Sequence, residues 1–214
     1  MSKEKPIIFN IEMVKAILAD RKTKTRRLNG LKEINENPNI WTLRKMGILG
    51  YYAKKSAQGK FGAYFETEKL MPRTLNICPV VCPWEVGDVL WVRETWNGIR
   101  LGNKTEYWYK AGNEFEDSAD EKWRSPRYMP KVAARLFLEV KDIQVERVQD
   151  ITEEDARAEG VIPFPKDPEG DCWADGLYRT AFQYMWNKIN GWNPNAFELN
   201  PWDWAVAFER VEKK

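Results

Sequence analysis

Histidine is absent from this sequence of 214 residues. Its absence excludes Ser-His-Asp and Cys-His catalytic arrangements, and it removes the usual imidazole general base. Any catalysis by this chain must therefore use lysine, glutamate, aspartate, threonine, serine, tyrosine or cysteine side chains.

Cysteine is scarce, with only Cys78, Cys82 and Cys172 in the chain. An odd and small number of cysteines does not make a disulfide scaffold and favours reduced thiols. Cys78 and Cys82 are close enough in sequence to form half of a zinc site, but only one further cysteine and no histidine remain to complete it. We expect no metal and no cofactor.

Long apolar runs are also missing. No segment approaches the roughly 18 consecutive apolar residues that a membrane span needs. Residues 1–5 are too polar and too few to form a signal peptide. We therefore expect a cytoplasmic protein without a membrane partner.

The charges nearly cancel, because 34 basic residues face 32 acidic ones for a formal net charge of +2. Bulk attraction will not coat the chain with nucleic acid, so an anion would have to bind at a local cluster. What the sequence does contain is 43% hydrophobic residues, including 11 Trp, 8 Tyr and 9 Phe. This composition predicts a folded core.

Hydrophobic periodicity predicts one α+β domain over residues 1–214. Strands are expected at 6–9, 63–66, 89–94, 105–110, 134–148 and 202–211, and helices after Asn10, after Thr152 and from Leu177. The strand at 89–94 is expected to be buried on both faces with 105–110 as its neighbour. A phase break at Lys141-Asp142 predicts a bulge or a bend. The order of elements favours a mixed, mostly antiparallel sheet or barrel, with insertions at about 29–83 and 161–176.

A basic cluster follows the first predicted helix. Of the eight residues 20–27, five are cationic, namely Arg21, Lys22, Lys24, Arg26 and Arg27. Such runs are often plain solvated surface. The interleaved Thr23 and Thr25 favour a site instead, because a hydroxyl beside lysine can bond a phosphate or a base, or can be activated as a nucleophile.

The run at 17–27 resembles the signature of ASCH domains, in which a helix leads into Gly-Arg-Lys-Thr-x-Thr-x-Arg. Asp20 stands where the signature has glycine. Blocks at 87–94, 152–160 and 204–210 are similar to the family's other conserved elements, so the resemblance covers nearly the whole chain. It implies a PUA-like mixed, mostly antiparallel β-barrel with flanking helices and insertions, most similar to larger ASCH proteins of phages and prophages.

One branch of that family removes the acetyl group from N4-acetylcytidine with a lysine, a threonine and a glutamate. The matching positions in this sequence are Lys22, Thr25 and Glu159. The resemblance implies that Thr25 attacks the amide carbonyl, that Lys22 assists deprotonation of the hydroxyl, and that Glu159 moves or orients the proton at the leaving amine.

Two further groups are candidates for binding. Arg93 and Glu94 follow a predicted buried strand, where they form either a charged mouth or part of an internal ion pair. Arg127 and Tyr128, near Lys131 in a proline-bounded loop, are candidates for phosphate contact and base stacking. Most tryptophans are expected in the core, namely Trp84, Trp91, Trp96, Trp186, Trp202 and Trp204.

Three functions are consistent with the sequence. The first is an amidohydrolase acting on an N4-acylated cytidine or a similar modified nucleoside. The second is a PUA-like module that binds RNA or DNA, with or without nuclease activity. The third is a non-catalytic phage accessory protein. The partner is accordingly a modified nucleoside or a nucleic acid.

Overall fold

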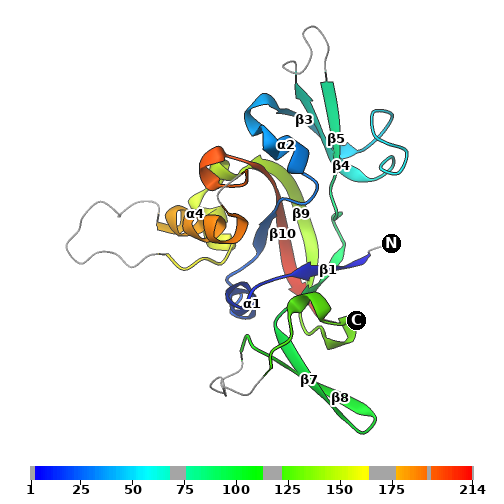
Figure 1. Ribbon diagram of the computed structural model, residues 1–214, viewed down its shortest axis with the longest axis vertical. Helices are drawn as coiled ribbons and strands as arrows, with labels where there is room; N and C mark the ends of the chain where they lie inside the picture. The colour runs from blue at the N-terminus through cyan, green and yellow to red at the C-terminus, as the bar shows by residue number, and fades with distance from the viewer. Residues whose placement is uncertain (1–2, 68–75, 113–121, 164–176, 192–193, 214) are drawn as a thin grey trace, which may run out of the picture.

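The computed structural model describes residues 3–67, 76–112, 122–163, 177–191 and 194–213. Its centre is a five-stranded sheet in the order β1-β6-β9-β10-β2 (Figure 1). The strands are β1 (Glu4–Ile8), β6 (Val89–Arg93), β9 (Phe137–Arg147), β10 (Trp202–Val211) and β2 (Lys24–Arg27). Only β1 and β6 pair in parallel, and within the described residues the edge strands β1 and β2 do not pair to close a barrel. The predicted α+β class with mostly antiparallel pairing is confirmed.

The long β9–β10 strand pair contributes buried side chains to the centre of the core. Fully buried Leu138 and Val140 on β9 face a core that also contains Trp204 and Val206 of β10. Ala207 pairs with Asp142 and Phe208 with Val140, so Lys141 is the extra residue of a bulge. The bulge predicted from the phase break is confirmed.

Three α-helices flank this sheet: α1 (Ile11–Leu18), α3 (Glu153–Ala158) and α4 (Leu177–Asn190). The Asn10 side chain accepts a hydrogen bond from the Met13 N–H at 2.9 Å, and the Thr152 hydroxyl accepts one from the Asp155 N–H at 3.1 Å. Both are N-cap contacts of the kind the sequence predicted. Phe182 and Trp186 of α4 pack with Ala156 of α3 in a second core cluster.

Residues 29–83 contain more regular structure than their sequence pattern indicated. They form α2 (Lys32–Glu36) and an antiparallel sheet of β3 (Thr42–Ile48), β4 (Phe61–Thr67) and β5 (Asn76–Val81). Ile34 and Phe65 are completely buried in the main core. The segment is thus joined to the central sheet through a shared hydrophobic interior.

The hairpin of β7 (Trp96–Leu101) and β8 (Lys104–Tyr109) corrects one expectation. Residues 105–110 were expected beside the strand at 89–94, but β8 pairs with β7, and β6 pairs with β1 and β9. A tight turn at Gly102 lets β8 pair with its nearest sequence neighbour. Within β6, Leu90 and Val92 are fully buried while the alternate residues are half-buried, so burial on both faces is only partial.

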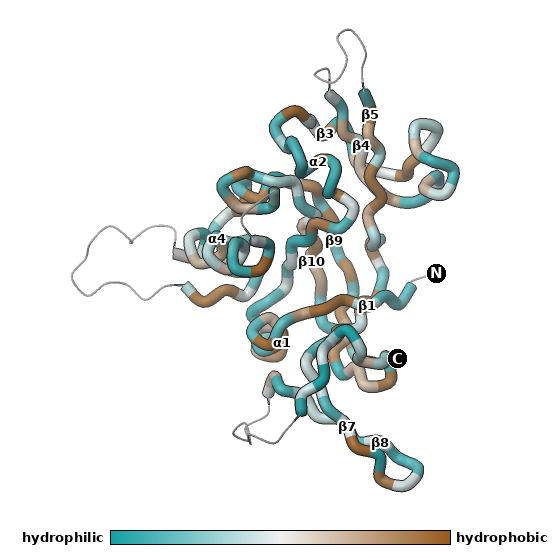
Figure 2. Tube along the Cα trace, in the orientation of Figure 1, coloured by the Kyte–Doolittle hydropathy of each residue, from teal (hydrophilic) through white to brown (hydrophobic). Residues whose placement is uncertain are grey.

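Hydrophobic residues colour much of β1 and β5 brown in Figure 2, whereas the connecting loops mix teal, white and brown. Trp84, Trp96, Trp186, Trp202 and Trp204 are buried as expected, and Trp91 is half-buried. In the described ranges, every helix is too short or too polar to cross a bilayer. The predicted insertion at 161–176 lies almost wholly outside the described residues.

Candidate functional site

A tight turn after α1 delivers the basic cluster to the sheet. The backbone N–H groups of Arg21 and Lys22 both donate to the Ala16 carbonyl, at 2.9 Å and 3.1 Å. Asp20, at the glycine position of the ASCH signature, has a φ of 52°. Glycine adopts this left-handed conformation freely, and aspartate is among the few other residues that tolerate it. The chain can therefore keep the turn without the glycine.

Lys22 and Glu159 form a buried ion pair. Lys22 Nζ lies 2.6 Å from Glu159 Oε2, and the two side chains are 0% and 2% exposed. The ammonium also donates to the backbone carbonyls of Glu159 and Lys24, each at 2.8 Å. All three of its N–H donors are thus satisfied.

Gly160 permits this close approach between Lys22, which precedes β2, and the end of α3. A Cβ at this position would lie 2.8 Å from the Cβ atoms of both Ala16 and Lys22, and the residue has a φ of +79°. Any side chain here would push Lys22 away from Glu159. Glycine thereby ends α3 and brings the two charged residues together.

Burial lowers the pKa of Lys22, because an ammonium loses its hydration in the interior. The Glu159 carboxylate opposes this effect through its charge and hydrogen bond, while Arg27 and Arg26 add to the lowering. As a net effect, Lys22 loses its proton to become the neutral amine at a lower pH than an exposed lysine does. A lysine with this property can accept a proton during catalysis.

Arg26 lies at the centre of a second set of charges. Its guanidinium donates to Glu146 at 2.7 Å and lies 3.5 Å from Asp203 and 3.8 Å from Glu159 Oε1. Asp155 is nearby at 3.7 Å. Arg26 therefore links Glu159 to further carboxylates, and it is a structural partner of the Lys22–Glu159 pair.

Asp203 is the least expected member of this set. It is fully buried on β10, and neither of its carboxylate oxygens accepts a hydrogen bond from any residue that the structure describes. Burial raises the pKa of Asp203 well above its ordinary value, with Arg26 opposing the shift. Sequence reasoning missed this residue, although an acid between Trp202 and Trp204 in an apolar strand was a signal for a buried cationic partner.

Arg27 differs from Arg26 because no carboxylate forms an ion pair with it in the described part of the chain. Its guanidinium donates to the carbonyls of Ile8 at 3.0 Å and Arg26 at 3.1 Å, and lies 4.9 Å from the centre of the Phe9 ring. Burial lowers its pKa, but arginine still carries its charge at neutral pH. Within the described residues Arg27 forms no direct ion pair, although the nearby charge of Glu159 partly offsets the lowering of its pKa.

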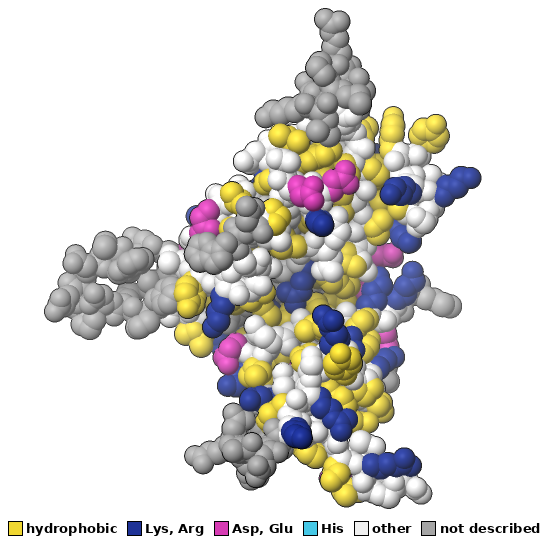
Figure 3. Space-filling model, viewed as in Figure 1, with side chains coloured by type: hydrophobic (Ala, Val, Ile, Leu, Met, Phe, Trp, Pro, Cys, Tyr) yellow, Lys and Arg dark blue, Asp and Glu magenta, His cyan; other side chains and the backbone are white. Residues whose placement is uncertain are grey.

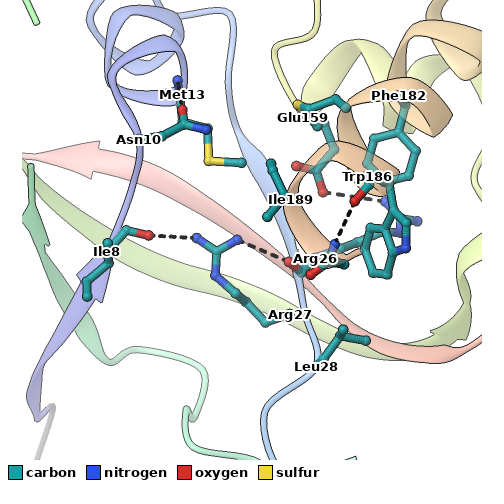
Figure 4. A pocket seen from close by; sticks show the side chains of 12 residues that line it. Ile8, Asn10, Met13, Arg26, Arg27, Leu28, Glu159, Phe182, Trp186 and Ile189 are labelled. Atoms are coloured by element: carbon teal, nitrogen blue, oxygen red, sulfur yellow. Dashed lines mark hydrogen bonds and ion pairs between the residues drawn. The ribbon is translucent and has the colours of Figure 1, made fainter. Parts of the chain in front are cut away.

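A cavity of about 290 Å³ lies between β1, β2, α1 and α4 (Figure 4), and neither Lys22 nor Asp203 is among its lining residues. Arg26, Arg27 and Glu159 contribute charge to its wall. Phe182 and Trp186 from α4 contribute aromatic surface, with ring centroids 5.8 Å apart. The arrangement can hold a small, flat, partly polar molecule against an acid and a cation.

Thr25 is placed differently from its proposed partners. It is completely buried on β2 opposite Val206, and its hydroxyl has no hydrogen-bond partner among the described residues. It does not belong to the cavity wall. The structure therefore brings Lys22 and Glu159 into contact, and of the three proposed catalytic residues only Glu159 lines the cavity.

The remaining residues of the basic cluster hold α3 against β2. Arg21 donates to the Gly160 carbonyl at 3.0 Å, and the Thr23 N–H donates to the Ala158 carbonyl at 2.8 Å. Lys24 forms an ion pair with Asp155. These contacts fix the position of the helix that carries Glu159.

The second group of candidates lies apart from the cavity. Glu94 is buried and accepts two hydrogen bonds from Arg135, at 2.9 Å and 2.8 Å, so it belongs to an internal ion pair with a partner other than Arg93. Arg93 instead donates to the Arg127 carbonyl. Arg127 is exposed, and Tyr128 is 74% exposed. None of these residues lines the cavity.

In comparisons with known proteins, no family model, no curated protein and no solved structure matches this chain.

Proposed function

We propose that this chain is an ASCH-type protein of PUA-like ancestry that hydrolyses the amide of an N4-acylated cytidine-type nucleoside. One observation carries the proposal. The buried pair joins Lys22 of the signature run to Glu159 of the later short helix, the two residues that the family resemblance proposed as a proton-transfer pair, and Glu159 lies in the wall of a cavity with aromatic and cationic sides. A proton-transfer pair thus adjoins a space suited to a nucleobase.

The cavity size supports a nucleoside as ligand. Its volume of about 290 Å³ is at the lower end of the roughly 300–1,000 Å³ typical of small-molecule sites. Phe182 and Trp186 provide rings against which a flat pyrimidine can stack. A duplex or a folded protein segment would be too large for this space.

Polar groups in the wall fit the reacting end of such a ligand. Glu159 Oε2 is held by Lys22, whereas Glu159 Oε1 accepts no hydrogen bond within the described part of the chain. Oε1 is buried in the structure, so it can bind the exocyclic N–H of the base once the side chains that cover it shift to expose it. The Arg27 guanidinium supplies positive charge for the oxygen of the acyl group as negative charge develops on it.

In the proposed reaction, an oxygen nucleophile adds to the acyl carbonyl carbon, and its proton passes to the Lys22–Glu159 pair. The C–N bond then breaks as Glu159 delivers a proton to N4, which leaves as the free amine of cytidine. With Thr25 as the nucleophile, a second step transfers the acyl group from its oxygen to water. With water as the nucleophile, the acid is released directly.

The position of Thr25 favours a second candidate function. Because its hydroxyl is buried and Thr25 does not line the cavity, the hydroxyl must become exposed through a shift of the side chain or the strand before it can attack. A PUA-like module that binds RNA or DNA through the same cavity and leaves the base unchanged needs no such movement. A phage accessory protein with an inactive site would have the same geometry.

Turnover of N4-acetylcytidine distinguishes these functions. The wild-type protein, Lys22→Met and a control, Lys15→Met on the exposed face of α1, are incubated with the nucleoside, and cytidine release is followed by chromatography. We expect Lys15→Met to match the wild type and Lys22→Met to be slower by at least about 100-fold, as for loss of a general acid or base. Circular dichroism confirms that each variant is folded, and Glu159→Gln provides a second test if Lys22→Met is not.

Equal rates for the wild type, Lys22→Met and Glu159→Gln would exclude the proposed chemistry. Binding of the nucleoside without release of cytidine by the wild type would favour the binding module. Thr25→Val assigns the nucleophile, because it abolishes turnover only if the Thr25 hydroxyl attacks.

A further inference from the structure

The connection between β3 and β4, residues 49–60, is a compact loop with an interior of its own. The Leu49 N–H donates to the Lys60 carbonyl and the Gly59 N–H to the Leu49 carbonyl, both at 2.8 Å. Leu49 and Tyr64 form a small buried cluster with Ala53. These contacts hold residues 49–60, which we call the β3–β4 loop, in a compact conformation.

The outer side of the β3–β4 loop exposes large aromatic rings. Tyr51 is 91% exposed and Tyr52 is 66% exposed, and adjacent Ile48 is 66% exposed. The two tyrosine rings lie edge to face with centroids 5.8 Å apart. Neither ring contributes to the core, and clusters of exposed apolar side chains of this kind commonly mark binding surfaces.

The same region is strongly basic. No aspartate or glutamate occurs from Thr42 to Lys60, whereas five cationic residues do: Arg44, Lys45, Lys54, Lys55 and Lys60. All five are exposed. Figure 3 shows basic and hydrophobic side chains projecting together at the upper right, over the end of the molecule that carries β3 and β4.

Two of these cations have local partners. Arg44 pairs with Glu66 at 3.2 Å, and Lys45 Nζ lies 5.2 Å from the centre of the Tyr64 ring. Lys54, Lys55 and Lys60 are exposed, and among the described residues they have no ion-pair partner of the kind that Arg44 has. The loop thus combines stacking surface with positive charge that is free to bind an anion.

We propose that the β3–β4 loop binds single-stranded nucleic acid. Tyr51 and Tyr52 stack on unpaired bases, and the three lysines contact the phosphates. Stacking on an exposed ring requires bases that are not already stacked in a duplex. A protein partner fits the loop less well, because lysine is depleted in protein–protein interfaces.

This inference is independent of the proposed hydrolysis. None of the loop residues lines the cavity next to Glu159. Variants of the loop can therefore lose nucleic-acid binding while N4-acetylcytidine turnover is unchanged. Variants of Lys22 can lose turnover while nucleic-acid binding is unchanged.

The test uses the full chain and fluorescence anisotropy with labelled single-stranded RNA and DNA of about 12 nucleotides. We compare the wild type with Tyr51→Ala/Tyr52→Ala and with Lys54→Gln/Lys55→Gln/Lys60→Gln. The matched control is Arg100→Gln/Lys104→Gln, which removes two exposed cations from the β7–β8 hairpin. All of these side chains lie on the surface, so the fold is expected to survive each change.

We expect the double tyrosine variant to bind at least about tenfold more weakly at constant charge. The triple lysine variant should reduce the slope of log K against log salt by about 2, given about 0.7 per phosphate contact on a single strand. The hairpin control should leave both quantities unchanged.

Four results would overturn the proposal. They are binding by the tyrosine variant equal to the wild type, an equal loss in the hairpin control, tighter binding of duplex than of single strands, and no binding of any oligonucleotide by the wild type. If vesicles rich in phosphatidylserine bind through the tyrosines while oligonucleotides do not, the loop docks on an anionic membrane surface and the proposal is wrong.

Discussion

Replacing Lys22 with methionine tests the buried ion pair most sharply. The change removes a 2.6 Å contact with Glu159 and hydrogen bonds to two backbone carbonyls, in a place where neither charge is exposed to water. Breaking a buried pair on one side costs about 3–5 kcal/mol, because the other charge remains uncompensated. Arg26 lies 3.8 Å from Glu159 and retains part of the compensation. We therefore expect a loss of about 3 kcal/mol.

The assay is urea denaturation at pH 7, followed by tryptophan fluorescence. Glu159→Gln and the double variant Lys22→Met/Glu159→Gln complete a double-mutant cycle. The double variant should lose less than the sum of the single losses, because no isolated buried charge remains. The control Lys15→Met, in an exposed pair with Glu12 at 3.6 Å, should match the wild type within error. A loss below about 1 kcal/mol for Lys22→Met, as at surface pairs, or additive single losses, would refute this reasoning.

Three further predictions follow from the same geometry. The raised pKa of Asp203 means that the folded protein retains a proton that the unfolded chain releases near pH 3.9, so this contribution to stability is lost as pH rises from about 4 through the folded pKa. Asp203→Asn should therefore exceed the wild type in stability by more at pH 7 than at pH 4. Denaturation curves with the opposite trend would contradict this prediction. Gly160→Ala should destabilise the fold by about 1–3 kcal/mol and slow turnover. The control Gly102→Ala, where φ is +61° and an added Cβ would have no atom within 4 Å, should cost less stability. Equal losses of stability in the two variants would refute a role for crowding at Lys22. If neutral Lys22 accepts a proton in the reaction, kcat/KM should rise with pH along a limb whose midpoint is below the ordinary lysine value of about 10.4, and a profile that is flat from pH 6 to 10 would exclude that role.

Local patterns accounted for much of the fold. The Asn10 and Thr152 caps, the bulge at Lys141 and the closing strand Trp202–Val211 each depend on residues close together in sequence, so the pattern contains the information. The choice of which strands pair with each other is not contained in such local patterns. Residues 104–109 looked like any exposed strand, and only the tight turn at Gly102 decides that they pair with β7.

Part of the candidate site could be predicted, because the family resemblance named Lys22 and Glu159. The Lys22–Glu159 contact joins residues 137 positions apart, and the sequence offered no physical reason for it apart from the family resemblance. The acid at position 203 in the apolar strand β10 indicated a buried cationic partner, but the sequence pattern could not identify that partner as Arg26, which is distant in sequence. Glu94 likewise pairs with Arg135, and no local pattern connects these two residues.

A crystal structure of the protein soaked with cytidine, the expected product, tests the central claim most directly. The account predicts the pyrimidine in the cavity beside Phe182 and Trp186, with its exocyclic amine within hydrogen-bond distance of Glu159 Oε1. Cytidine bound elsewhere, or a cavity without it at saturating concentration, would contradict the claim that the Lys22–Glu159 pair serves a nucleoside site.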